Sequence, residues 1–134
     1  MAVGNTNRSF RELSVYKRAF ELAMEIFEVS KSFPKEERYS LTDQIRRSSR
    51  GVCGCIAEAY RKRDYQAYFV SKSSDADMEN SETQAWLDFS YACKYIDEKK
   101  CMELLAMSEE VGRMLNHMVE NPERYIRQKD KISG

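Results

Sequence analysis

The stretch that decides the fold runs from Leu13 to Ser30 and reads LSVYKRAFELAMEIFEVS. Its apolar residues recur at spacings of three and four, which is the period of an α-helix and not that of a strand. They form two series that point about 120° apart on a helix. The first series is Leu13, Tyr16, Phe20, Ala23 and Phe27, and the second is Val15, Ala19, Leu22, Ile26 and Val29. The stretch therefore predicts a helix with two apolar faces.

A helix in a monomeric bundle normally needs one apolar face, so the second face requires an explanation. An extra apolar stripe of this kind marks an association surface, and a wide core face is the alternative. We expect an oligomer, with a ring favoured. The residues predicted to form its interface are Val15, Leu22, Ile26 and Val29.

Three further helical patterns follow, separated by stop and start signals. Phe33-Pro34 ends the first helix, and the second is expected from about residue 40 to 63. Asp64 is placed to cap a third helix that runs to about residue 96, and Asp97 to cap a fourth that ends at Asn121-Pro122. No strand pattern with turn chemistry appears. The sequence predicts an all-α, antiparallel up-down-up-down four-helix bundle over residues 10–125, between a flexible N-terminus (1–9) and a flexible charged tail (126–134) that frays from about Tyr125.

Composition supports a single helical domain. The chain has 134 residues, which excludes a multidomain enzyme, and only 5 Gly and 2 Pro, which favours long elements. Its apolar runs are far shorter than the roughly 18 residues of a membrane span, and its start has no apolar signal core. We expect a cytoplasmic protein without membrane contact.

Two helices contain residues that a packed helix does not favour. The stripe expected to face inward on the third helix is partly polar, so its members need hydrogen-bond partners inside the bundle. It consists of Phe69, Ser73, Ala76, Asn80, Thr83, Leu87 and Tyr91. The second helix contains Gly51 and Gly54, each costing about 1 kcal/mol relative to alanine, which predicts the close approach of another backbone.

The residues offer little for catalysis. His117 is the single histidine, so a di-iron bundle site is excluded, and Cys53 and Cys55 point away from each other on a helix and cannot share a metal. A Cys–His nucleophile pair is the alternative, but nothing in the sequence activates a thiol. No phosphate-binding glycine motif is present. We expect no enzyme, no catalytic residue, no metal and no cofactor, and buried free thiols at Cys53, Cys55, Cys93 and Cys101.

Charge is zero in sum but unevenly distributed. Residues 34–63 carry eight basic and four acidic side chains, whereas residues 64–98 carry two basic and eight acidic ones. The basic set combines phosphate-binding groups with the nearby rings of Tyr60, Tyr65 and Tyr68, which predicts a nucleic-acid-binding face. It comprises Arg46, Arg47, Arg50, Arg61, Lys62 and Arg63. The alternative is pairing with the acidic third helix, at Asp75, Asp77, Glu79 and Glu82. Glu58 is expected to be partly buried in a structural salt bridge.

Five segments in order resemble one bacterial family. They are FRELSVYKRA from Phe10, FPKEERYSLTDQIRRSS from Phe33, IAEAYRKR from Ile56, ETQAWL from Glu82 and RMLNHM from Arg113. The sequence resembles the four-helix bundle proteins encoded in intervening sequences of 23S ribosomal RNA genes, a family similar in fold to the accessory proteins of diversity-generating retroelements.

The resemblance implies an antiparallel bundle assembled as a homopentamer, with a proposed role in nucleic-acid binding. The family's Gln-Arg-Arg stretch falls on Gln44, Arg46 and Arg47, and its Ala-Glu element on Ala57 and Glu58. Cys55 stands where the family often has Asn. Two functional classes follow: an oligomer that binds RNA or DNA through the basic side of the second helix, or a scaffold for a protein partner such as a reverse transcriptase.

Overall fold

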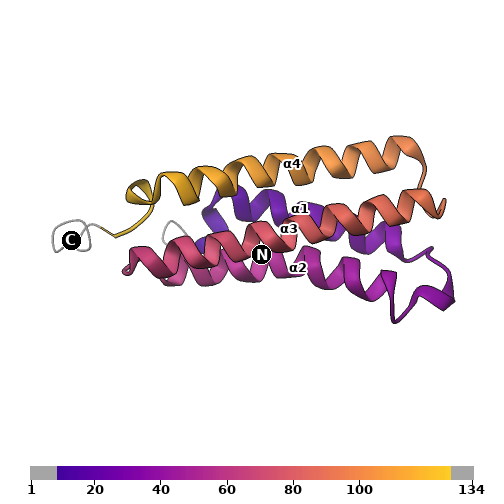
Figure 1. The fold of residues 1–134 in the computed structure, drawn as a ribbon, viewed down its shortest axis with the longest axis horizontal. Helices are drawn as coiled ribbons and strands as arrows, with labels where there is room; N and C mark the ends of the chain where they lie inside the picture. Colours follow the sequence, from indigo (N-terminus) through magenta and orange to yellow (C-terminus); the bar gives the residue numbers. More distant parts are fainter. Residues whose placement is uncertain (1–8, 128–134) are drawn as a thin grey trace.

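A computed structural model describes residues 9–127, and these form four α-helices joined by short connections (Figure 1). The helices are α1 (Ser14–Ser30), α2 (Leu41–Arg61), α3 (Gln66–Ala92) and α4 (Glu98–Glu120). Three short 3-10 helices accompany them: η1 (Phe10–Glu12), η2 (Lys35–Glu37) and η3 (Pro122–Arg124). The described part of the chain contains no strand, so the prediction of an all-α bundle is confirmed.

Short connections make consecutive helices run in opposite directions. The connection 62–65 spans at most about 14 Å, whereas the 21 residues of α2 extend about 32 Å. Since α3 packs along α2, the chain must reverse at this connection. α4 packs against both α3 and α1, which closes the bundle into four neighbouring pairs of helices (Figure 1).

The predicted caps and stops hold at α4 but not at α3. Asp64 does not cap α3, whose N-cap is Tyr65 without a side-chain capping hydrogen bond. Asp97 Oδ1 accepts a hydrogen bond of 2.8 Å from the Lys100 amide, and α4 ends before Pro122, as predicted. α3 ends four residues earlier than predicted, because Lys94 adopts a left-handed φ of 65°. The amide of Tyr95 then donates to the carbonyl of Ser90 at 2.9 Å, which is the closing bond of a Schellman motif.

Two clusters of buried apolar side chains fill the bundle, one toward each end. Ile56 and Leu115 belong to the first cluster, and Ile45 and Leu104 belong to the second. All four side chains are completely buried. Burying an aliphatic side chain of this size contributes about 1.5–3 kcal/mol, so these clusters are the main source of stability.

A polar layer separates the two clusters and satisfies the predicted need for partners on α3. The Asn80 amide donates to the Ser108 carbonyl at 2.9 Å, and the Ser108 hydroxyl donates to Asn80 Oδ1 at 2.9 Å. The Thr83 hydroxyl is 2.9 Å from that of Ser48 on α2. The predicted α3 stripe is confirmed except at its end, where Tyr91 is 45% exposed.

The α1 stripe assigned to a subunit interface lies in the core, so that assignment is wrong. Val15, Leu22 and Ile26 are 5%, 2% and 0% exposed, and Val29 is half-buried. The other helices of the same chain cover this stripe, because the inner side of each helix in a closed four-helix bundle is shielded from solvent. The exposed apolar side chains of α1 are Phe20 and Met24, at 49% and 44%.

The prediction of a close backbone at the two helical glycines is wrong. A Cβ atom at Gly51 would lie 2.8 Å from the Cδ atom of Glu79, so a side chain approaches there. A Cβ atom at Gly54 would meet nothing within 4 Å. Gly51 therefore makes room for a carboxylate on α3, and Gly54 has no packing role in the described part of the chain.

The chain beyond α4 stays on the bundle to the end of the described residues. The ring of Tyr125 stacks on Phe69 with centroids 5.6 Å apart, and Ile126 is 9% exposed. The amide of Arg127 donates to the Arg63 carbonyl at 3.2 Å. The predicted fraying from Tyr125, and a tail beginning at residue 126, are therefore wrong for residues 125–127, because the turn after Pro122 directs these side chains onto the core. The rest of the predicted tail (128–134) and residues 1–8 of the predicted flexible N-terminus lie outside the described residues.

None of the helices in residues 9–127 combines the length and the apolar character that crossing a bilayer requires.

Candidate nucleic-acid interface

The six predicted basic side chains fall into two groups along α2. Arg46, Arg47 and Arg50 lie in its first half and are called the mid-helix arginines here. Arg61, Lys62 and Arg63 lie where it ends and are called the turn cations. Fifteen residues separate Arg46 from Arg61, which corresponds to about 22 Å along a helix. The structure thus presents two basic areas and not one continuous patch.

An aromatic side chain of α1 holds two of the mid-helix arginines. The guanidinium carbons of Arg46 and Arg50 lie 4.8 and 5.6 Å from the centroid of the Phe27 ring. Arg46 Nε also donates a 2.8 Å hydrogen bond to the Ser30 hydroxyl. Both guanidinium groups are therefore positioned along the seam between α1 and α2, and cation–π contact supplies about 0.5–1 kcal/mol for each exposed pair.

Arg47 lies about 100° from Arg46 around α2, on the side toward α3. Burial and the neighbouring Glu82 raise the pKa of Glu79, and the positive charge of Arg47 opposes that shift. Arg47 therefore influences the carboxylate that packs over Gly51. The mid-helix arginines consequently flank α2 on two sides.

Tyrosine rings accompany the turn cations, as the sequence predicts. Arg63 Nε donates to the Tyr60 carbonyl at 2.8 Å, and its guanidinium carbon lies 3.6 Å from the Tyr60 ring centroid. The ammonium nitrogen of Lys62 lies 4.9 Å from the Tyr68 ring. Tyr65 and Tyr68 are 61% and 57% exposed. Arg63 is thus half-buried and partly structural, whereas the two exposed rings are available for stacking.

Direct ion pairs between the two basic groups and acidic α3 side chains are absent from the described residues, and Arg47 acts on Glu79 only at longer range. Within residues 9–127, none of the four carboxylates expected as partners lies within 4 Å of a basic nitrogen of the two groups. Asp75 instead binds Lys72 at 3.3 Å, and Glu58 binds the same ammonium at 2.8 Å. These contacts raise the pKa of Lys72 to about 12. Glu58 makes the predicted salt bridge, but it is exposed and not partly buried.

The residues considered for catalysis are dispersed. No group of three metal-binding side chains occurs in the described part of the chain. His117 Nδ1 lies 2.7 Å from the Tyr125 hydroxyl on an exposed surface. All four cysteines are free, as predicted, but Cys101 alone is buried and Cys93 is exposed. Burial raises the pKa of the Cys53 thiol to about 11, so that thiol is not activated.

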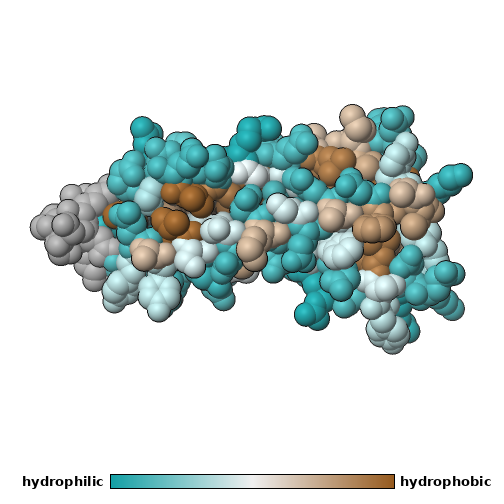
Figure 2. All heavy atoms as spheres, in the orientation of Figure 1, coloured by the Kyte–Doolittle hydropathy of each residue, from teal (hydrophilic) through white to brown (hydrophobic). Residues whose placement is uncertain are grey.

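Sequence reasoning missed an apolar groove at the end of the bundle where α2 begins and α3 ends, called the end groove here. It has a volume of about 370 Å³, and its lining includes Tyr39, Leu41, Trp86 and Phe89. Tyr39 and Phe89 are 85% and 56% exposed, and Figure 2 shows hydrophobic residues on the surface toward both ends of the bundle, this one included. The indole Nε1 of Trp86 is buried without a hydrogen-bond partner among the described residues. Helical periodicity could not indicate the end groove, because one of its lining residues, Tyr39, lies in the connection before α2 and not in a helix.

Comparisons with known proteins agree with the fold. No curated protein matches this chain. A solved structure from Bacteroides thetaiotaomicron, a protein of unknown function from the S23 ribosomal protein family, is 25% identical with a TM-score of 0.72. That match covers 78% of this chain and 97% of the other. The family model of the 23S rRNA-intervening sequence protein matches residues 11–117. The chain therefore belongs to the 23S rRNA-intervening sequence protein family.

Proposed function

We propose that this protein is a non-enzymatic helical bundle that binds RNA or DNA by contacting phosphates with α2 and the turn that follows it. The observation that carries the proposal is the lack of carboxylate partners. Within the described residues, none of the mid-helix arginines or turn cations has a carboxylate oxygen within 4 Å. Basic groups that the chain does not neutralise are those that gain most from neutralising phosphates.

The local geometry supports phosphate contact. Arg46 and Arg50 are held over Phe27, so less side-chain freedom is lost when they bind a ligand. Arg46 and Arg61 are about 22 Å apart along the helix, which corresponds to about six nucleotide steps of 3.4 Å. A strand of about eight nucleotides can therefore reach both groups.

We also propose that the chain self-associates, so that an assembly repeats the basic groups. The support is the exposed part of α1, where Phe20 and Met24 are neighbours on one face at 49% and 44% exposure. The ring of Tyr16 lies 6.0 Å from that of Phe20 and extends this apolar surface. The homopentamer implied by the resemblance belongs to this proposal. A mass near 15.7 kDa by light scattering at micromolar concentration would contradict it.

A salt titration tests nucleic-acid binding. The triple variant Arg46→Gln, Arg47→Gln and Arg50→Gln should weaken binding to a 12-nucleotide RNA and DNA alike, because phosphate contacts carry no sequence information. The slope of log affinity against log salt should become shallower by about 2, since each neutralised phosphate contributes about 0.7–0.9.

The matched control removes the same charge from cations that already have carboxylate partners. Lys17, Arg18 and Lys100 lie 3.8, 2.7 and 3.2 Å from Glu12, Glu21 and Glu25, respectively. Changing these three side chains to Gln should leave the slope close to that of the wild type. An unchanged slope in a folded arginine variant would refute the proposal.

The end groove favours a second candidate function, as a scaffold for a protein partner such as a nucleic-acid enzyme. The rings of Tyr39 and Phe89 line this groove and are 85% and 56% exposed, so apolar side chains of a partner can cover them. Loss of a partner in the Phe89→Asp variant, with the salt slope intact, would separate this function from nucleic-acid binding.

A further inference from the structure

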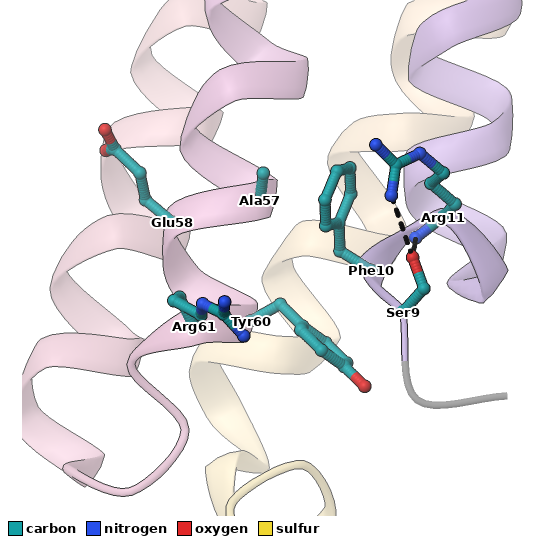
Figure 3. Close-up of a pocket in the computed structure, with 7 residues that line it drawn as sticks. All are labelled: Ser9, Phe10, Arg11, Ala57, Glu58, Tyr60 and Arg61. Atoms are coloured by element: carbon teal, nitrogen blue, oxygen red, sulfur yellow. Dashed lines mark hydrogen bonds between the residues drawn. The ribbon is translucent and has the colours of Figure 1, made fainter. Parts of the chain in front are cut away.

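A second cavity lies at the opposite end of α2, between this helix and η1. It has a volume of about 450 Å³, and its lining includes Phe10 and Arg11 from η1 and Ala57, Tyr60 and Arg61 from α2 (Figure 3). One of these side chains, Arg61, is also a turn cation. The cavity therefore adjoins the basic group at the end of α2.

The walls of this cavity are apolar, and one of them is a fixed aromatic ring. Figure 3 shows the Phe10 ring directed toward the methyl group of Ala57 across the cavity. The Phe10 ring meets Tyr16 edge-on with centroids 4.9 Å apart, and the Arg11 guanidinium carbon lies 4.5 Å from its centroid. Phe10 and Ala57 are both half-buried, so each keeps surface that a ligand can cover. A flat ring facing a small side chain is suited to a flat aromatic ligand.

The rim of the cavity is positively charged. Arg11 and Arg61 are exposed, and neither has a carboxylate within 4 Å in residues 9–127. Glu58 also borders the cavity, but Figure 3 shows its carboxylate directed away from Phe10. The Lys72 ammonium on α3 holds that carboxylate at 2.8 Å. The acid nearest to Arg61 along the helix is thereby already neutralised by another cation.

We propose that this cavity binds one unpaired nucleotide of a single strand, with the base against Phe10 and the flanking phosphates at Arg11 and Arg61. An apolar slot with two unpaired guanidinium groups at its rim matches a ligand that joins an aromatic ring to anionic groups. A paired base cannot enter, because both of its neighbours in the stack and its partner strand hold it in the duplex. The inference rests on the proposed function and adds to it a preference for single strands.

Fluorescence of a stacked base tests this assignment. The probe is an eight-nucleotide oligouridylate with one central 2-aminopurine, and the comparison is a mixed-sequence duplex of about 20 base pairs with 2-aminopurine at its centre, which stays paired under the same conditions. Stacking on an aromatic ring quenches 2-aminopurine, so wild-type protein should quench the single strand and leave the duplex unchanged.

Two variants remove the slot in different ways. Ala57→Met fills the cavity on a helix that tolerates methionine, and Phe10→Leu removes the stacking surface. Each should abolish the quenching and lower single-strand affinity about tenfold, the size expected for one lost stacked base. The control Ala85→Met lies on the exposed side of α3 and should behave as the wild type.

The outcomes separate this inference from the function on which it rests. Quenching that persists in folded Ala57→Met and Phe10→Leu proteins, or that is equal for the duplex, would overturn the nucleotide site. A normal salt slope in those same proteins would then leave the proposed function standing. Failure of the wild-type protein to bind either oligonucleotide at low salt would overturn both.

Discussion

Replacing Asn80 by alanine should destabilise the bundle more than any other exchange of a polar α3 side chain. Asn80 is 2% exposed and makes two hydrogen bonds of 2.9 Å with Ser108, one to its carbonyl and one from its hydroxyl. Alanine would leave the Ser108 hydroxyl without its acceptor, at a cost of about 1–3 kcal/mol. The vacated space adds a cavity term, so we expect a total loss of about 3 kcal/mol in the free energy of unfolding.

Thermal unfolding followed by circular dichroism measures this loss. For a chain of this size, 1 kcal/mol shifts Tm by about 3 °C, so the expected decrease is about 10 °C at constant protein concentration. The matched control is Asn116→Ala, since Asn116 is exposed on α4, and it should shift Tm by less than about 2 °C.

A double-mutant cycle with Ser108→Ala identifies the cause. If the two side chains depend on each other, the double variant should lose at least about 1 kcal/mol less than the sum of the two single variants. A decrease in Tm for Asn80→Ala no larger than that of Asn116→Ala would refute the view that the polar layer contributes to stability.

Three further outcomes follow from local geometry. Gly54→Ala should raise the free energy of unfolding by about 1 kcal/mol in urea titrations. Gly51→Ala should raise it by less, because the new Cβ atom would displace the Glu79 carboxylate that packs over residue 51. With a thiol reagent at pH 8, Cys93 should react first and Cys53 slowly, since Cys93 is exposed and burial raises the pKa of Cys53 to about 11; mass spectrometry of the labelled peptides reports the order. The hydroxyl groups of Ser40 and Tyr95 donate to the Glu37 carboxylate and lower its pKa. The stability that this carboxylate contributes is therefore complete above pH 4.5, the ordinary pKa, and is lost as the pH falls through the lower pKa of the folded state. An acid titration of the Glu37→Gln variant should not show this loss of stability.

The number, type and order of the helices could be predicted because they depend on local patterns. Spacing of three and four, a proline at residue 34 and the N-cap at Asp97 act within one or two turns of the chain. The end of α3 could not be placed in this way, because a lysine and not a glycine adopts the left-handed conformation at Lys94. Lysine in that position has no distinctive sequence signal.

The burial of α1 shows where periodicity stops being informative. Two apolar series of equal length left open which one faces inward, and the choice of Val15, Leu22 and Ile26 as the outer one was wrong. Periodicity measures the angle between two faces but not the position of the core. That position depends on where α2 and α4 pack, which is a property of the whole bundle.

The basic side chains could be named from the sequence, but their partners could not. Nothing in the spacing indicates that Phe27 lies beneath Arg46 and Arg50, because this contact joins two different helices. The Phe10 cavity escaped notice for the same reason, since its two walls are 47 residues apart between Phe10 and Ala57.

A chain with zero net charge can still present uncompensated basic groups, and the ion pairs explain how. Three cations, Arg18, Lys72 and Lys100, each lie within 4 Å of two carboxylates. Among the described residues these three therefore take up six acidic side chains, twice their own charge. A zero sum therefore does not give each cation a partner of its own, and the mid-helix arginines and turn cations have no carboxylate oxygen within 4 Å in the described part of the chain. Screening limits the field of these cations to about 8 Å at physiological salt, so any ligand of this surface must come into direct contact with it.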